Sequence, residues 1–241
     1  LSSGAFVAVD QLGSIGSVAM WTVGSGGDAI VRTSGALVLG ASSVGGRLRA
    51  TAAGGNLTDT GGVSVLGAAG ASFATLAPGA SIVLDTLSVA GPISPVTAAV
   101  GGFGGTGGDA TIVNAFAVNL ASWQVQGRLT LTATTGGITD SGTSVVGGDA
   151  TFTTLAPNAP ITLDSTSVGG RTGFVTSGPA GHVAYIAPGA VTLSSTSVGG
   201  SLCVVAAGPI ADAGPVVVAG ASSFQAVAPR AAITRDTFDP P

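Results

Sequence analysis

The sequence contains no lysine and no glutamate, and only 7% of its 241 residues are charged. In globular domains about a quarter of all residues are usually charged, and exposed helix surfaces are built largely from Lys, Glu, Gln and Ala. A chain without the first two lacks the residues that solvate and support long helices. Its hydrophobic fraction of 45% is still sufficient for a core. The sequence therefore predicts a folded chain without long helices.

Other classes of partner and location are also disfavoured. All seven basic residues are arginines spread along the chain, and the net charge is −4, which argues against nucleic acid and against anionic membrane surfaces. The uncharged stretch 86–108 is interrupted by proline and glycine, so we expect no membrane insertion. The first ten residues show no signal-peptide pattern. One cysteine cannot form an internal disulfide, and the apolar neighbours of Cys203 indicate a position in or near the core.

Glycine, Ser, Thr, Ala and Val take the place of charge, a mixture typical of short strands joined by tight turns. The same words recur: ITLDSTSVGG (161–170) returns as VTLSSTSVGG (191–200), with looser copies at 37–46, 82–91 and 233–238. ATLAPGA-like phrases precede most copies, and phrases such as QGRLTLTATTGGITD follow three of them. Apolar residues alternate with polar ones inside each phrase, which predicts strands.

The copies begin 45, 79, 30 and 42 residues apart, and we interpret these spacings as two, four, one and a half, and two turns of about 20 to 22 residues. Such a period predicts a single all-β domain over 1–241, a parallel β-helix (β-solenoid) of about eleven turns and on the order of 50 Å long. A β-sandwich would not reuse one phrase so closely, and leucine-rich repeats need a Leu and Asn ladder that is absent. Residues 1–25 match the repeat poorly and are expected to form irregular first turns. Residues 92–108 are expected to form a Gly/Pro-rich inserted loop.

Most of the eleven aspartates fall at recurring positions. Asp28, Asp109 and Asp149 open GDA phrases, and GGTGGDATI (104–112) loosely resembles a calcium-binding nonapeptide, so these three are weak calcium candidates. Calcium-binding rolls repeat that nonapeptide in tandem, whereas this match stands alone. We therefore favour structural corners, in which each carboxylate bonds the backbone amide two residues on. No cofactor is expected.

No catalytic residues are predicted. Carbohydrate-cleaving sites need converging carboxylates, and the sequence shows no such cluster in a regular part of the chain. The single histidine, His182, excludes a zinc site with several His ligands, and a Ser-His-Asp triad would need a nucleophile elbow that the chain lacks. We interpret His182 as a solvated corner residue, with counterparts Asp149 and Ala71, and expect no enzyme.

Aromatic residues are few. Phe73, Phe152, Phe224 and Tyr185 precede the LAP-type phrases and are expected to pack inside the rod. Trp21 and Trp123 fall outside this series, so they are the candidates for an exposed contact. Threonine rows, as in Thr130, Thr132 and Thr151, Thr153, leave ice binding as a further alternative.

The phrases GRLTLTATTGGITDSG, GGRLRATAAGGNLTD and SLCVVAAGPIADAG resemble the haemagglutination-type repeats of filamentous-haemagglutinin-like proteins. The resemblance implies a right-handed β-helix and an extracellular or cell-surface bacterial protein. A solenoid also presents unpaired backbone groups at its two open ends. We therefore expect a structural rod that stacks end to end with itself as a homopolymer, or that joins a neighbouring surface protein in a filament. The alternative is an adhesin or glycan-binding rod that contacts a glycan or a cell-surface receptor.

Overall fold

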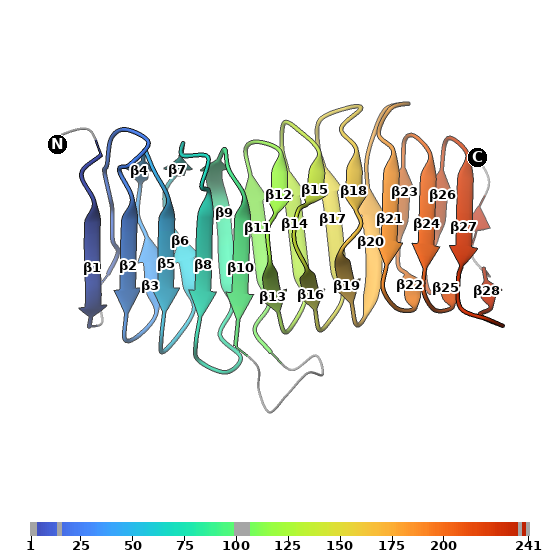
Figure 1. Cartoon of the computed structure of the whole chain (residues 1–241), viewed down its shortest axis with the longest axis horizontal. Helices are drawn as coiled ribbons and strands as arrows, with labels where there is room; N and C mark the ends of the chain where they lie inside the picture. Colours follow the sequence, from blue (N-terminus) through green and yellow to red (C-terminus); the bar gives the residue numbers. More distant parts are fainter. Residues whose placement is uncertain (1–3, 14–15, 99–106, 236–237, 240–241) are drawn as a thin grey trace.

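The computed structural model describes residues 4–13, 16–98, 107–235 and 238–239. They form a rod of stacked turns, with the two ends of the chain at opposite ends of the rod (Figure 1). Two parallel sheets make up the rod, and we call them sheet A and sheet B. Among the described residues no helix is long and apolar enough to cross a membrane.

Sheet A contains β1 (Val7–Leu12), β2 (Ala29–Thr33), β5 (Leu48–Ala52), β8 (Ala71–Thr75), β10 (Ile93–Thr97), β12 (Val118–Leu120), β13 (Trp123–Val125), β15 (Ile138–Asp140), β16 (Ser144–Val146), β18 (Ile161–Leu163), β19 (Thr166–Val168), β21 (Val183–Ala187), β24 (Leu202–Ala206) and β27 (Ser222–Ala226).

Sheet B contains β3 (Leu37–Leu39), β4 (Ser42–Val44), β6 (Leu57–Asp59), β7 (Val63–Val65), β9 (Ile82–Val89), β11 (Ala110–Asn114), β14 (Leu129–Ala133), β17 (Ala150–Thr154), β20 (Arg171–Val175), β22 (Val191–Leu193), β23 (Thr196–Val198), β25 (Ile210–Asp212), β26 (Val216–Val218), β28 (Ile233–Thr234) and β29 (Phe238–Asp239).

The predicted parallel β-solenoid is confirmed. Every strand pairing is parallel, as in Leu129↔Ala150 between β14 and β17. Successive turns of sheet A begin 19 to 25 residues apart, from Ala29–Leu48 at the short end to Ile93–Val118 at the long end. The chain makes ten complete turns from β1 to β27, close to the eleven expected.

Each turn combines two kinds of half-turn. A straight half-turn is one strand of five or six residues, such as β14. A split half-turn is two short strands around a corner, such as β18 and β19, or the long β9 that pairs with both β6 and β7. The phrase ITLDSTSVGG is the split kind, and GRLTLTA is the straight kind. The chain forms the same two kinds of half-turn again and again, which explains why the same sequence phrases recur.

The two sheets exchange these roles twice. Sheet A is straight from β1 to β10, split from β12 to β19, and straight again from β21; sheet B is the reverse. Each exchange occurs where two straight half-turns follow one another, β10 then β11, and β20 then β21. The 30-residue spacing is therefore one and a half turns, as predicted. The 79-residue spacing covers three and a half turns and not four, because β10 and β11 are two successive straight half-turns between the split half-turns at β9 and β12.

Buried polar side chains satisfy the backbone where straight and split half-turns meet. Asn114, fully buried, accepts a hydrogen bond from the Val89 N–H (2.8 Å) and donates to the carbonyls of Val89 (3.0 Å) and Ala117 (3.0 Å). In sheet A the Thr97 hydroxyl accepts from the Gln126 N–H (2.9 Å). At the second exchange the Tyr185 hydroxyl donates to the carbonyl of Thr166 (3.2 Å).

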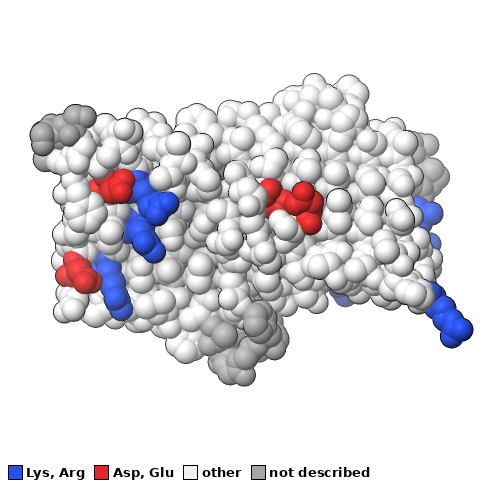
Figure 2. All heavy atoms as spheres, in the orientation of Figure 1, with Lys and Arg blue, Asp and Glu red and all other residues white. Residues whose placement is uncertain are grey.

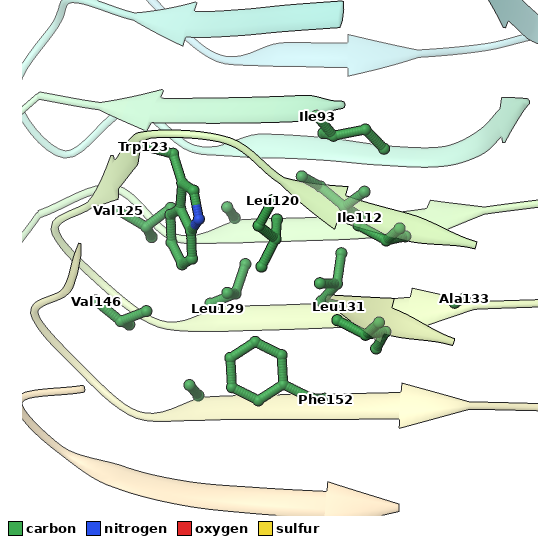
Figure 3. Close-up of a cluster of buried hydrophobic side chains, with 14 of the residues drawn as sticks. Ile93, Ile112, Leu120, Trp123, Val125, Leu129, Leu131, Ala133, Val146 and Phe152 are labelled. Carbon is green, nitrogen blue, oxygen red and sulfur yellow. The ribbon is translucent and has the colours of Figure 1, made fainter. Parts of the chain in front are cut away.

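The core is one continuous apolar column between the sheets, from Met20 to Val218, and Figure 3 shows its middle part. The core prediction for Phe73, Phe152 and Tyr185 is confirmed, and Phe224 packs against the core at the last straight strand. They do not form one stack, because the role exchange places Phe152 in sheet B and the others in sheet A. Phe152 instead stacks on Phe174 (5.9 Å between centroids), which contacts Tyr185 (5.4 Å).

The expected loop at 92–108 begins too early. Residues Ile93–Thr97 form β10, paired along its length with β8. Pro95 fits because the next turn pairs with β10 at Ile93↔Leu120 and Val96↔Gln124 only, so Pro95 lies opposite the corner between β12 and β13, where its missing N–H is not needed. Residues 99–106, the centre of the expected loop, lie outside the described part of the chain.

Two further expectations are corrected. Residues 1–25 are not irregular throughout, since β1 pairs with β2 from Val7↔Ala29 onward; residues 1–3 and 14–15 lie outside the described part. Cys203 is exposed on the outer face of β24, because it alternates with the buried Leu202 and Val204.

Candidate functional site

The three calcium candidates each bond the backbone of the following turn. The Oδ1 atom of Asp28 accepts from the Arg47 N–H (2.7 Å), that of Asp109 from the Arg128 N–H (2.7 Å) and that of Asp149 from the Arg171 N–H (2.8 Å). The partner amide lies 19 to 22 residues on, so the expectation of a bond two residues on is wrong. These aspartates connect turns of the rod.

The glycine before each of these arginines leaves room for the carboxylate. A Cβ added to Gly46, Gly127 or Gly170 would collide with the Oδ1 atom of Asp28, Asp109 or Asp149, respectively. The sequence motifs GDA and GR therefore form one contact, in which the aspartate of GDA accepts a hydrogen bond from the arginine N–H of GR in the next turn.

A second group of aspartates binds the split corners. Asp140 lies at the end of β15 and accepts from the Asp164 N–H (3.0 Å), the Ser165 N–H (3.0 Å) and the Thr166 hydroxyl (2.7 Å). Asp59 makes the same contacts with the amides of Asp85 and Thr86. Their carboxylate oxygens are thus committed to the protein.

The described residues contain no group of three or more His, Cys, Asp or Glu side chains that could hold a metal ion. Asp109 and Asp149 lie in sheet B two turns apart, with Arg128 between them, and Asp28 lies in sheet A. The arrangement does not bring the three candidates together.

We expect D140A to lower the free energy of unfolding by about 2 to 4 kcal/mol, because it leaves two backbone amides and two hydroxyls without their carboxylate. D164A is the matched control: it removes an exposed carboxylate from the next turn, and only the backbone N–H of Asp164 is used in the contact. Urea unfolding of both variants measures the difference. Equal losses for D140A and D164A would contradict the bridging role of Asp140.

His182 takes the place of an aspartate. Its Nδ1 atom accepts from the Ser201 N–H (3.0 Å) and lies 2.9 Å from the Ser201 hydroxyl, the geometry that Asp28 and Asp109 have in the other repeats. The counterparts in this contact are therefore Asp28, Asp109 and Asp149. The predicted counterpart Asp149 is confirmed, whereas Ala71 is the first residue of β8 and makes no such contact. With Nδ1 occupied in this way, His182 connects turns and is a poor general base.

The two tryptophans have opposite environments. Trp21 is 58% exposed, whereas Trp123 is 4% exposed and points into the core (Figure 3). Trp123 is therefore wrong as a contact candidate. VNLASWQVQG (118–127) is a loose copy of LVLGASSVGG (37–46), so Trp123 occupies the inward position of Ser42, and aligning these phrases would have shown it.

The threonine rows form only a small patch on sheet B. Thr130 pairs with Thr151 and Thr132 with Thr153 on the outer face, but Gly173 follows Thr151 and Val175 follows Thr153. One row is three turns long, because Thr111 precedes Thr130, and the other is two turns long, because Val113 precedes Thr132. The ice-binding alternative therefore finds no regular array in the described part of the rod.

A groove of about 450 Å³ lies on the outer face of sheet A. Its floor is formed by small residues of β8 and β10, including Ser72 and Ser94. Arg47 and Arg49 line one side, and the corner Ala121–Ser122 between β12 and β13 lines the other. Flat straight strands meet the first split corner of sheet A at this place, so the groove is a consequence of the role exchange.

Two of the seven arginines, Arg47 and Arg49, line this groove, and Arg32 lines a separate hollow on the same sheet. Arg32 on β2 and Arg49 on β5 both point outward, and Arg47 immediately precedes β5. Figure 2 shows one group of basic atoms over the N-terminal turns, beside acidic ones, and further basic atoms at the C-terminal end of the rod. Sequence reasoning treated the arginines as dispersed, because Arg32 and Arg49 come onto adjacent strands only when β2 and β5 are paired, with Arg32 opposite Thr51.

The fold and these surfaces define a repeat protein of the parallel β-solenoid class. The model of the family described as repeats of unknown function (DUF5649) matches residues 26–95, 107–176 and 180–234, and the chain belongs to this family. No curated protein and no solved structure matches the chain.

The family repeat explains the exchange of roles. The first two matches each comprise seven half-turns, of which the first and the last are straight. They run from β2 to β10 and from β11 to β20. Seven is odd, so each new repeat begins on the opposite sheet. Consecutive repeats are thus rotated by about half a turn around the rod, and equivalent residues such as Arg47 and Arg128 lie on opposite faces.

Proposed function

We propose that the protein is a non-enzymatic structural rod that stacks into, or forms part of, an extracellular surface filament. The observation that carries this proposal is the match between the two ends of the rod. Sheet A ends in straight strands at both ends, β1 and β27, and sheet B is split at both, at Val18 and Trp21 and at β28. Two exchanges restore the starting arrangement, so further turns can continue the rod without a junction.

The outermost strands of the described rod each have a neighbour on one side. Among the described residues β1 pairs only with β2, and β27 only with β24. The inward residues Val7, Val9 and Phe224 are only half-buried there, unlike their counterparts within the rod. Unpaired edges with apolar inner faces favour association with a similar strand. The extracellular location is supported by the resemblance to haemagglutination-type repeats.

Arg235 restrains this association at one end. It occupies the inward position of Leu84 and Leu163 in the earlier repeats, and its guanidinium lies 4.5 Å from the centre of the Phe224 ring. An inward charge at a sheet edge is a known device against uncontrolled pairing. A stacking turn must displace or bury this arginine.

We therefore expect the wild-type protein to form end-to-end rods as its concentration rises, and R235L to do so at a concentration at least about tenfold lower. Negative-stain electron microscopy and light scattering measure the rod length, with R230Q as a control that removes a charge from a turn. Single rods for both the wild type and R235L at every concentration would remove the filament proposal.

The second candidate function is an adhesin or glycan-binding rod segment. The groove on sheet A and the exposed Trp21 favour it, because both present side chains outward on a rigid scaffold. It is compatible with a structural rod, since the flat faces stay free when the ends are joined.

A further inference from the structure

We propose that the groove on sheet A binds an acidic polysaccharide, with Arg47 and Arg49 as the residues that recognise its carboxylate or sulfate groups. This inference rests on the second function proposed above and names the class of ligand.

The groove has a defined direction. Pairing places Arg49 opposite Ser72, and Ser72 opposite Ser94, in one outward column along the rod axis. Neighbouring strands lie about 4.8 Å apart, so the column spans about 10 Å from the cation to the second hydroxyl, and Ser122 closes it. A linear polymer fits this shape better than a compact ligand.

The polar groups of the groove are available. Among the described residues, the side chains of Arg47, Arg49, Ser72, Ser94 and Ser122 make no hydrogen bond within the protein. Aspartates close to the arginines are already engaged in part: the Asp28 carboxylate accepts from the Arg47 N–H, and Asp10 accepts from the Gln11 N–H. The guanidiniums therefore keep donors for a ligand.

The chemistry of the groove favours anionic sugars. Guanidinium groups bind carboxylate and sulfate through paired N–H donors, and serine hydroxyls suit the hydroxyls of a sugar. The groove floor offers no aromatic side chain on which a nucleobase could stack.

The test is surface plasmon resonance of the full chain on immobilised heparin (sulfated) and polygalacturonate (carboxylated), with dextran as the neutral polymer and double-stranded DNA as the competing polyanion. We expect saturable, salt-sensitive binding to at least one acidic polysaccharide, and at least tenfold weaker binding by R47Q/R49Q. S94Y, which fills the groove without changing its charge, should weaken binding as much. R128Q removes the repeat-equivalent arginine from the opposite face and should change binding less than twofold.

Equal weakening by R128Q, or DNA binding as tight as polysaccharide binding, would overturn the proposal in favour of general charge attraction. Polysaccharide binding that R47Q/R49Q and S94Y leave unchanged would overturn the groove assignment while keeping a glycan-binding rod. Absence of binding to both acidic polymers would remove the glycan-binding function as well, and would leave the structural rod to its own assembly test. Thermal melting of each variant establishes that it is folded.

Discussion

N114A is expected to lower the free energy of unfolding by about 3 to 5 kcal/mol. Asn114 is fully buried at the place where the split β9 meets the straight β11, and the pairing between these strands shifts register between Ile112 and Asn114. Its side chain supplies the partners that the shifted ladder cannot give to the backbone of Val89. Replacing it by Ala leaves these buried groups unsatisfied and opens a cavity.

Asn119, five residues along the chain, is the matched control. It lies on β12, and its side-chain oxygen is buried without a hydrogen-bond partner in the described structure. Removing an amide whose oxygen is already unsatisfied costs little, and N119A should change the free energy of unfolding by less than about 1 kcal/mol. Urea denaturation of both variants provides the comparison. A loss for N114A no larger than that for N119A would mean that the register shift does not depend on Asn114.

The contrast between these two asparagines shows where sequence reasoning stops. The repeated sequence phrases predict strands, the alternation of buried and exposed residues, and the solenoid. These features depend on local patterns and on a period that recurs several times in the sequence. ATIVNAF and FAVNLAS look alike as strand segments. Only the stacking of one repeat on the next, with its half-turn rotation, makes Asn114 a junction residue and leaves Asn119 on an ordinary strand.

The candidate site was less predictable for the same reason. Asp28, Asp109 and Asp149 were recognised as recurrent, but their partners lie one turn away, and the intervening length varies from 19 to 22 residues. The groove depends on Arg49, Ser72 and Ser94 sharing one column, and no local pattern in the sequence relates these three. Because the number of residues per turn varies, the sequence does not reveal the pairing register between strands of successive turns. That register determines which side chains lie together on each face of the solenoid.

Alkaline pH is expected to destabilise the rod through one side chain. Burial raises the pKa of Tyr185 from its ordinary value of 10.0 to about 12, with a smaller opposing effect from a hydrogen bond with Thr172. The neutral phenol is favoured in the folded state. Its contribution to the free energy of unfolding is therefore fully present below pH 10 and is lost as the pH rises from about 10 to about 12. Two pKa units correspond to about 3 kcal/mol, an order-of-magnitude value.

The composition makes this prediction unusually clean. Tyr185 is the only tyrosine, and the chain has no lysine, so no other tyrosine and no lysine titrates in the same window. The ultraviolet absorbance of tyrosinate should report a midpoint near pH 12 in the folded protein and near pH 10 in urea. C203S removes the thiol from the measurement.

Y185F separates this titration from the packing of the ring. The variant loses the hydrogen bond to the Thr166 carbonyl, so it should be less stable by about 1 kcal/mol at neutral pH. Its stability should then stay level between pH 10 and pH 12, where the wild type loses about 3 kcal/mol, and the two curves should cross. A parallel fall of both curves would place the alkaline sensitivity outside Tyr185. A crossing would show that burial at the second exchange of sheet roles holds the Tyr185 phenol neutral. Tyr185 would then serve the second exchange as Asn114 serves the first.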